Sequence, residues 1–444
     1  MTDFLIFYEH VNREVENDTL VKYELEKRGY SCEILHFSGP GLYNYHKKKN
    51  RAKVVVTPWL RYNCDVLEYL PYAGKPYKLV NLQWEQVYNK RGIECGLVAT
   101  HDEAKKAYHT CWGENSRARL EDMGVPPENL RVVGAMQQDY GRPLFNDYYL
   151  SRSSISEQFH LNNDKPWILF VSSLAYATFP EDALKALATK YGDGIYETAD
   201  LHKTTQKELL IWVEEFLKRS DSEFIYRPHP SERLCERLTE LSDRYPNFHV
   251  ISEKSVKQWA KVSDRVNLWI STSNAEIASL GIDYSIVRPV PVDEAREVES
   301  MRDETFVESM EEFISLNTDI LPMDTERIKE RQQKLFHFYN YDDAKPAYVR
   351  IADYLEEVYL SSNGQSFDFN LKDKVKARFI DFKARMVSKV AERAIRKCDR
   401  SIIDRSLFKS HIKKNIHAML KKHDLKEQAE NSMMDYLKSH EQKA

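Results

Sequence analysis

Two short polar segments combine residue types that bind phosphate. The first is the tetrapeptide Arg227, Pro228, His229 and Pro230, and the second is Ser271, Thr272, Ser273 and Asn274. A guanidinium group can make paired hydrogen bonds to phosphate oxygens. An imidazole titrates near neutrality and can donate a proton or a hydrogen bond to a departing oxygen. Together these side chains predict a site for a phosphate-bearing ligand.

Both segments follow an apolar run that is typical of a buried strand, and both precede a predicted helix. In an open α/β sheet, ligands bind where the carboxyl ends of strands meet helix N-termini. Taken alone, each segment also fits a structural role, a proline-bounded turn or a helix N-cap. Their occurrence in successive strand-to-helix turns favours the binding site.

Several carboxylates are candidates for chemistry at such a site. Glu9, Glu85 and Asp139 each lie near a predicted strand end and are candidates for the general base, and each also fits a structural carboxylate bonded to backbone. Trp84, next to Glu85, offers a surface for a sugar or a nucleobase. Glu276, in the first turn of a predicted helix, can hold a ribose hydroxyl or complement the helix dipole.

The elements that position these residues alternate between strand and helix. The N-terminal half has predicted strands at Phe4–Tyr8, Cys32–Phe37, Lys53–Thr57, Leu79–Leu82, Leu97–Ala99 and Arg131–Gly134. The C-terminal half has them at Trp167–Leu174, Glu223–Arg227, Phe248–Ile251, Val266–Ile270 and Tyr284–Val287. Such alternation predicts two α/β domains with parallel, doubly wound, Rossmann-like sheets, facing one another across a cleft.

We expect a first domain at residues 1–145, an irregular linker at 146–165, a second domain at 166–342 and a return helix at 343–360. Residues 175–203, which contain Gly192 and Gly194, are predicted to form a loop over the cleft.

The charge distribution sets residues 365–444 apart as a basic tail. They hold 20 Lys+Arg and 11 Asp+Glu, against 45 and 58 in the rest of the chain. Within residues 371–397 a helix is predicted whose apolar residues are Leu371, Val375, Phe379, Phe382, Met386, Val390 and Ala394. A basic amphipathic helix suits an anionic membrane surface. The alternative is that its apolar stripe packs on the body or on another copy. The tail lacks the interleaved aromatics of a nucleic-acid binder, and we expect no nucleic-acid partner.

The remaining composition excludes other classes. The six cysteines have irregular spacing, which predicts reduced thiols, and Cys95, His101, His109 and Cys111 lack the tight pairs of a structural zinc site. No metal is therefore expected. The first residues read as a strand and not as a signal peptide, and no apolar run has the length of a membrane span. We expect a cytoplasmic protein, peripheral on the inner face of the membrane.

The two polar segments also resemble a known family. RPHP at 227–230 followed by STS at 271–273 is similar to the HP and S motifs of bacterial GT-B-type capsule and sialic-acid or Kdo glycosyltransferases. NLQWEQ at 81–86, CWG at 111–113 and GVPPENLRVVGA at 124–135 resemble bacterial surface-carbohydrate biosynthesis proteins. The resemblance covers roughly residues 1–360 and not the tail. The acidic motif that supplies the general base in sialyltransferases is not evident.

The resemblance implies a GT-B-like, metal-independent glycosyltransferase without a cofactor. It would move a sugar from a cytidine nucleotide (CMP-sugar) to a surface polysaccharide or its lipid anchor, with His229 and the serines at the nucleotide phosphate. A CDP-polyol phosphotransferase, a nucleotide-sugar 2-epimerase of the same fold and a non-catalytic glycan-assembly partner remain the alternatives.

Overall fold

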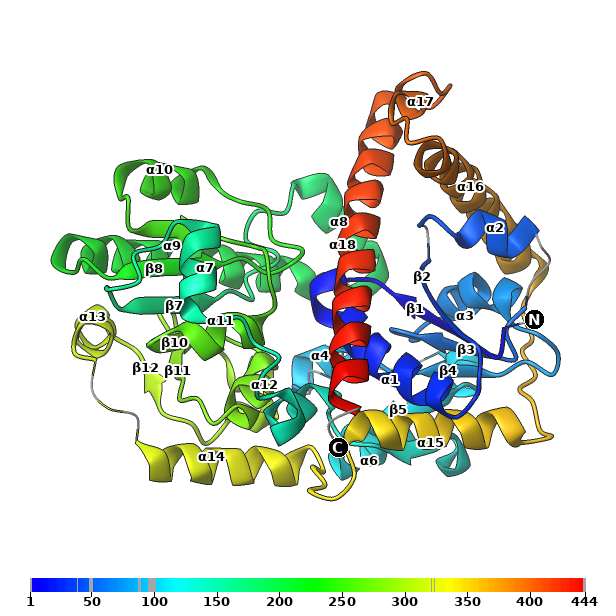
Figure 1. Cartoon of the computed structure of the whole chain (residues 1–444), viewed down its shortest axis with the longest axis horizontal. Coiled ribbons are helices and arrows are strands. Elements are labelled where there is room, and N and C mark those ends of the chain that lie inside the picture. Colours follow the sequence, from blue (N-terminus) through cyan, green and yellow to red (C-terminus); the bar gives the residue numbers. More distant parts are fainter. Residues whose placement is uncertain are drawn as a thin grey trace. The chain divides into compact units, whose positions relative to one another are not determined.

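The computed structural model describes residues 2–37, 39–47, 51–86, 89–94, 101–320, 322 and 324–441 (Figure 1). It forms two compact units. Unit 1 comprises Met1–Gln86, Val98–Met136 and Tyr339–Ala444, and unit 2 comprises Val87–Leu97 and Gln137–Phe338. The tail therefore belongs to unit 1, and residues 137–145, which we expected in the first domain, belong to unit 2. Cys95 and the strand expected at Leu97–Ala99 lie outside the described residues.

Unit 1 contains a six-stranded parallel sheet with the order β2-β1-β3-β4-β5-β6. Its strands are β1 (Phe4–Tyr8), β2 (Cys32–His36), β3 (Val54–Thr57), β4 (Leu79–Asn81), β5 (Tyr108–Cys111) and β6 (Leu130–Val132). All five residues of β1 are buried, as expected for a strand covered on both faces. The chain passes from β1 to β2 on one side and then to β3 on the other, so the strand order reverses next to β1.

Helices flank this sheet and cover its apolar faces. Those before the tail are η1 (Val11–Val15), α1 (Glu16–Lys27), α2 (Leu42–Lys47), α3 (Asn63–Tyr69), η2 (Leu70–Tyr72), α5 (Asp102–Lys105), α6 (Glu114–Asp122), η3 (Pro127–Asn129) and α15 (Ala347–Leu360). Helix α15, the expected return helix, packs on α1. The core combines strand residues such as Leu5 and Val55 with Tyr69 of α3 and Phe369 from the start of the tail.

Unit 2 contains a second six-stranded parallel sheet, with the order β12-β11-β10-β7-β8-β9. Its strands are β7 (Trp167–Val171), β8 (Glu223–Arg227), β9 (Phe248–Val250), β10 (Arg265–Leu268), β11 (Ser285–Val287) and β12 (Phe306–Val307). The chain builds β8 and β9 on one side of β7 and then β10, β11 and β12 on the other. Its strand order therefore reverses between β7 and β10, and the two doubly wound sheets confirm the predicted fold class.

The helices of unit 2 correct two predictions. They are α4 (Lys90–Glu94), η4 (Met136–Gly141), η5 (Pro143–Phe145), α7 (Arg152–Phe159), α8 (Glu181–Tyr191), α9 (Gly194–Arg219), α10 (Glu236–Arg244), α11 (Val256–Val262), α12 (Ser273–Ser279), η6 (Glu294–Arg296), η7 (Glu299–Met301), α13 (Met310–Thr318) and α14 (Thr325–Phe338). The loop predicted at 175–203 is wrong, because α8 and the start of α9 occupy most of it. Gly192, with φ 82°, ends α8, and α9 begins two residues later. The linker expected at 146–165 carries α7, which Ser151 caps.

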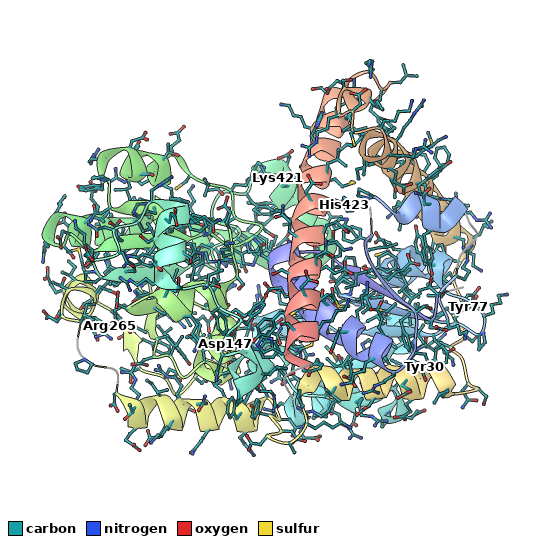
Figure 2. The ribbon with its side chains drawn as sticks, viewed as in Figure 1. Tyr30, Tyr77, Asp147, Arg265, Lys421 and His423 are labelled. Carbon is teal, nitrogen blue, oxygen red and sulfur yellow. The ribbon has the colours of Figure 1, made fainter. Side chains whose placement is uncertain are left out.

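The tail forms three helices, α16 (Leu371–Arg396), α17 (Ser401–Asp404) and α18 (Ser410–Glu441), which pack on unit 1. Helix α16 contacts α2 and α3, and α18 runs beside α1 (Figure 1). Lys22 of α1 donates to Glu430 of α18 at 2.6 Å, and Lys426 pairs with the same carboxylate. A cavity of about 330 Å³ lies between β2 and the tail, with His423 of α18 in its lining (Figure 2).

None of the helices in the described part of the chain is both long and apolar enough to cross a membrane.

Candidate functional site

The strand order of unit 2 reverses at the point where three strands end side by side. Val171 of β7 is in register with Arg227 of β8 and with Leu268 of β10. The segments that follow these three residues therefore leave the sheet at one edge. In doubly wound sheets this edge, at the reversal of strand order, is where ligands bind. The HP turn (residues 227–230) and the S turn (residues 271–274) are two of these segments, as the sequence predicted.

Arg227 is a buried cation that forms no salt bridge to a carboxylate within the described residues. Its side chain is 5% exposed, and its Nη2 donates to the carbonyl oxygen of Lys254 at 2.5 Å. Within the described residues its Nε has no hydrogen-bond acceptor, and it forms no ion pair. Burial lowers the pKa of the guanidinium to about 10, against the opposing effects of Glu276 and Glu253. Arg227 is still charged at neutral pH, and a buried charge of this kind favours an anionic ligand.

A single carboxylate holds the HP turn in shape. Glu232 accepts hydrogen bonds from the backbone N–H of His229 at 3.0 Å and from the hydroxyl of Ser172 at 2.5 Å. Its other oxygen accepts from the hydroxyl of Tyr226 at 2.6 Å and from the amide of Gln206 at 2.9 Å. The three side-chain donors lie just after β7, in β8 and in α9, so Glu232 ties the turn to all three elements.

His229 has a defined tautomer when it is neutral. Its Nδ1 accepts a hydrogen bond from the backbone N–H of Ser231 at 3.1 Å, which places the proton on Nε2. His229 is half-buried, whereas Pro228 is buried and Pro230 is exposed. The imidazole is therefore fixed by the turn and presents an N–H donor, as a group that stabilises a departing phosphate oxygen must.

A second histidine lies near His229. His202 of α9 packs edge-on against the ring of Trp269, with ring centroids 5.0 Å apart. Burial, with a smaller contribution from the neighbouring His229, lowers the pKa of His202 to about 3. His202 is therefore neutral at physiological pH and adds no charge beside His229.

The S turn presents hydroxyls but not all of its predicted residues. Ser271, Thr272 and Ser273 are partly exposed, and the Ser271 hydroxyl accepts from the backbone N–H of Ser273 at 3.2 Å. Asn274 is fully buried, and its amide donates to the hydroxyl of Ser300 at 3.2 Å. We therefore leave Asn274 out of the ligand-binding set. Glu276 lies 3.8 Å from the ammonium group of Lys257.

Asp139 is placed where it cannot reach a ligand. It lies in η4, is completely buried, and pairs with Arg142 at 2.9 Å. A buried carboxylate that already holds a guanidinium is a structural group. The structure thus argues against Asp139 as the general base, although its proximity to a strand end suggested that role.

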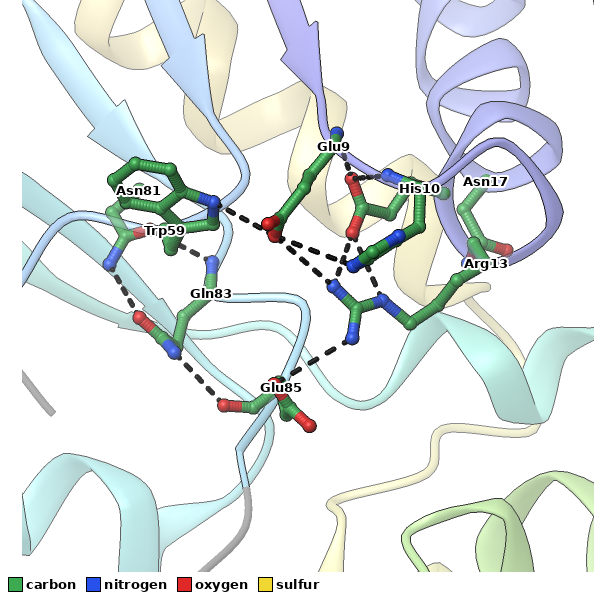
Figure 3. A network of polar contacts seen from close by, with 9 residues as sticks. Glu9, His10, Arg13, Asn17, Trp59, Asn81, Gln83 and Glu85 are labelled. Atoms are coloured by element: carbon green, nitrogen blue, oxygen red, sulfur yellow. Dashed lines mark hydrogen bonds and ion pairs between the residues drawn. The ribbon is translucent and has the colours of Figure 1, made fainter. Parts of the chain in front are cut away.

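Unit 1 has its own polar network at the point where its strand order reverses (Figure 3). Glu9 follows β1, and its carboxylate accepts from the indole N–H of Trp59, just beyond β3, at 3.0 Å. Arg13 of η1 pairs with the buried Glu14 at 2.6 Å and lies 3.7 Å from Glu9 and 3.6 Å from Glu85. One guanidinium thus holds three carboxylates.

Two of these carboxylates can meet a ligand. The side chains of Glu9 and Glu85 are 35% and 43% exposed, whereas Glu14 is buried and accepts from the backbone N–H of Glu9. Burial, with help from Glu14 and Glu85, raises the pKa of Glu9 above its usual value, although Arg13 opposes the shift. A raised pKa makes a carboxylate a better proton acceptor for a hydroxyl.

Trp84 is not the binding surface that the sequence suggested. It is buried, and the turn around it is held by Asn81, whose side-chain oxygen accepts from the backbone N–H of Gln83 at 3.0 Å. Gln83 has φ 47°, a left-handed conformation that costs energy for a residue with a side chain. This turn directs Glu85, two residues later, towards Arg13.

Sequence reasoning missed Glu232, Gln206 and His202. Glu232 stands three residues after His229, and that spacing was a usable signal for a side chain folding back on its own turn. The other two lie on the part of α9 that was read as a loop or left without a role, and nothing local to them indicates contact with the HP turn.

Among the described residues, no group of three or more His, Cys, Asp or Glu side chains is placed to hold a metal ion.

The two doubly wound units constitute a GT-B-like fold, and comparison with solved structures agrees. The structure is similar to that of S. aureus MnaA with UDP, with a TM-score of 0.51 and 13% identity over 83% of this chain and 100% of that chain. It is also similar to Methanocaldococcus jannaschii UDP-GlcNAc 2-epimerase in complex with UDP-GlcNAc and UDP, with a TM-score of 0.51 and 14% identity over 80% of this chain and 100% of that chain. For a variant of the wall teichoic acid polymerase TagF the TM-score is 0.50 and the identity 12%, over 80% of this chain and 89% of that chain. At these identities the likeness establishes the fold alone.

No protein-family model matches the sequence, and no curated protein matches it.

Proposed function

We propose that the chain is a GT-B-type glycosyltransferase that takes a sugar from a cytidine nucleotide, as a CMP-sugar, and adds it to a bacterial surface polysaccharide or its lipid anchor. The observation that carries this proposal is the buried Arg227, which forms no salt bridge to a carboxylate within the described residues and lies in the same turn as His229. Glu276 and Glu253 act on it only through space, and the phosphate of the nucleotide would be its direct anionic partner. Glu276 is placed in this scheme to hold a ribose hydroxyl.

The reaction follows from the charges. The bond between the anomeric carbon and the phosphate oxygen breaks, and its electron pair stays on that oxygen. Arg227 and the Nε2–H of His229 stabilise the new charge, with the hydroxyls of Ser271 and Ser273 as further donors. An acceptor hydroxyl forms the new bond to the anomeric carbon and gives its proton to a carboxylate. The sequence candidates for this base are Glu9 and Glu85 of unit 1, and of these Glu9 has a raised pKa, which suits a proton acceptor.

Other nucleotide chemistry on the same fold provides the competing functions. Two of the similar structures are of a UDP-GlcNAc 2-epimerase and a protein crystallised with UDP, which keeps a nucleotide-sugar 2-epimerase as the principal alternative. Another similar structure is that of a wall teichoic acid polymerase, so a CDP-polyol phosphotransferase is a further alternative. A non-catalytic glycan-assembly partner would bind a nucleotide without turnover. The cytidine preference rests on the HP and S motifs.

The test is a nucleotide panel followed by turnover. The full-length protein is titrated calorimetrically with CMP, CDP, UMP, UDP and GDP, and the same titrations are run on Arg227→Gln. Arg265→Gln is the matched control. Arg265 is the first residue of the central strand β10, at the end of the strands opposite to the HP turn, and it donates to backbone carbonyls (Figure 2). The proposal requires CMP to bind best, and binding must be lost in Arg227→Gln and kept in the control.

Other outcomes assign the alternatives. A preference for CDP favours polyol-phosphate transfer, and a preference for UDP favours the epimerase. Equal binding by the wild type and Arg227→Gln would refute the site. Binding of CMP without release of CMP from any CMP-sugar, in the presence of glycan acceptors, would favour the non-catalytic partner.

The acceptor and the location are part of the same proposal. In this proposal the protein lies in the cytoplasm, peripheral on the inner face of the membrane, where a lipid-anchored acceptor would be within its reach.

A further inference from the structure

The first half of α16 exposes a continuous apolar stripe. Leu371, Phe379 and Phe382 are 77%, 59% and 57% exposed, and Val375 and Met386 are also exposed. These residues are spaced by three or four, so at about 3.6 residues per turn they lie along one side of the helix. Large apolar side chains gathered in this way mark an interaction surface.

The opposite side of α16 holds the helix on unit 1. Asp381 accepts a hydrogen bond from the hydroxyl of Tyr72 at 3.2 Å, and Ser388 accepts from the backbone N–H of Tyr43 at 2.9 Å. Glu392 accepts from the backbone N–H groups of Gly41 and Tyr43 at 2.9 and 3.0 Å. These contacts orient the helix, so the apolar stripe is presented outward by the fold.

The end of the stripe is covered. Ala391 and Ala394 are buried with Ile403 of α17 and Ile416 and Leu420 of α18. The outward apolar surface is therefore limited to residues 371–386, whereas the sequence suggested 371–397. We call residues 371–386 the exposed face of α16.

Basic residues border the exposed face on both sides. Successive residues turn by about 100°, which places Lys372, Lys376 and Lys383 on one flank and Lys374, Arg378 and Arg385 on the other. Only Asp373 and Asp381 are acidic in this segment, and Asp381 pairs with Arg385. The ammonium group of Lys383 lies 4.4 Å from the ring centroid of Phe379, so the charge stands directly beside the stripe.

We propose that the exposed face of α16 docks on an anionic lipid bilayer. An apolar stripe between two basic flanks matches the acyl boundary and the anionic headgroups of such a surface. A second copy fits poorly, because pairing two of these faces would bring like charges together. Nucleic acid would neutralise the flanks but leave five large apolar side chains without a partner. An anionic bilayer matches both the apolar stripe and the basic flanks. This proposal is independent of the reaction proposed for unit 2.

The proposal is tested by cosedimentation of the full-length protein with vesicles. One set of vesicles contains about 30% phosphatidylglycerol in phosphatidylcholine, which makes the bilayer anionic. The other set contains phosphatidylcholine alone. The stripe variant is Phe379→Ser with Phe382→Ser, and the flank variant is Lys376→Gln with Lys383→Gln. The control is Leu407→Ser, because Leu407 is fully exposed (105%) between α17 and α18, away from the stripe.

The wild type and Leu407→Ser should bind anionic vesicles, and less so in high salt. The stripe variant should bind at least about tenfold more weakly, and the flank variant about 25-fold more weakly, from about fivefold per lysine. All the substituted residues are exposed, and thermal melts verify that the variants fold. Equal binding by the wild type and the stripe variant, or no vesicle binding at all, would overturn the proposal. So would a concentration-dependent dimer that the stripe variant abolishes, because it would assign the face to a second copy.

Discussion

Replacing Arg227 with glutamine should make the ligand-free protein more stable and remove its response to nucleotide. Burial lowers the pKa of Arg227 from 12.5 to about 10, which corresponds to about 3 kcal/mol against the charged form at about 1.4 kcal/mol per unit. Because the guanidinium is charged in both the folded and unfolded states at neutral pH, this penalty is constant between pH 6 and 8. Glutamine removes the charge but also weakens the bond to the carbonyl of Lys254, a loss of about 1 kcal/mol.

The net expectation is a gain of about 2 kcal/mol in the free energy of unfolding of unit 2. For a domain of roughly 200 residues this raises Tm by about 4–8 °C. Nucleotide at 100 times its Kd should stabilise the wild type by about 2.7 kcal/mol and the variant by much less. Differential scanning fluorimetry of the wild type, Arg227→Gln and Arg265→Gln, each with and without nucleotide, measures both effects. An Arg227→Gln variant that is less stable without ligand and keeps the full ligand shift would refute the reasoning.

Three further substitutions test separate parts of the structure. His229→Asn keeps an acceptor for the Ser231 N–H but lacks the Nε2–H donor, so nucleotide binding should persist while single-turnover rates fall by about 10²–10⁴-fold; an unchanged rate would remove His229 from the chemistry. Glu232→Gln leaves two of the four donors without an acceptor, so chemical denaturation should show a free energy of unfolding lower by about 1–3 kcal/mol. Hydrogen exchange should also become faster in the HP turn, and unchanged exchange would contradict the role of Glu232 as the residue that holds this turn. Burial beside Glu14 raises the pKa of Asp18 well above its usual value, so the folded state favours the protonated acid. The contribution of Asp18 to the free energy of unfolding is therefore fully present below the unfolded-state pKa and is lost as the pH rises through the folded-state pKa. Asp18→Asn should therefore be more stable than the wild type at pH 7 with a smaller advantage at pH 4, and an advantage that does not change with pH would show that Asp18 is not protonated.

Much of the fold could be predicted because its buried strands are short apolar runs. Phe4–Tyr8 is found as predicted, and the strand that begins at Trp167 ends three residues before its predicted end. Strand β5 was not predicted, because Tyr108–Cys111 contains His109 and Thr110. These polar side chains are buried and satisfied inside the sheet, for example by the carbonyl oxygens of Ala104 and Leu82. The partner of Thr110 lies 28 residues away and that of His109 in the preceding helix, and the alternation of apolar and polar residues does not show either contact.

The residues 175–203 were misread because glycine was taken as the mark of a loop. Only Gly192 and Asp193 separate α8 from α9, and Glu181 and Asp182 complement the start of α8. Part of the candidate site could likewise be predicted from the sequence and part could not. Arg227 and His229 could be identified from their position at a strand end. The role of Glu232 depends on donors from β7, β8 and α9, and the burial of Asn274 and Asp139 depends on packing that spacing does not show.

The most direct test of the proposed site is to locate bound nucleotide by hydrogen–deuterium exchange. The full-length protein is compared with and without saturating CMP, with GDP as the matched nucleotide control. The account predicts slower exchange in peptides that contain Arg227–Glu232 and Ser271–Glu276, and no change in the distant helix Met310–Thr318. Protection that appears elsewhere, or no protection by any nucleotide in the panel, would contradict the assignment of the HP turn as the phosphate site.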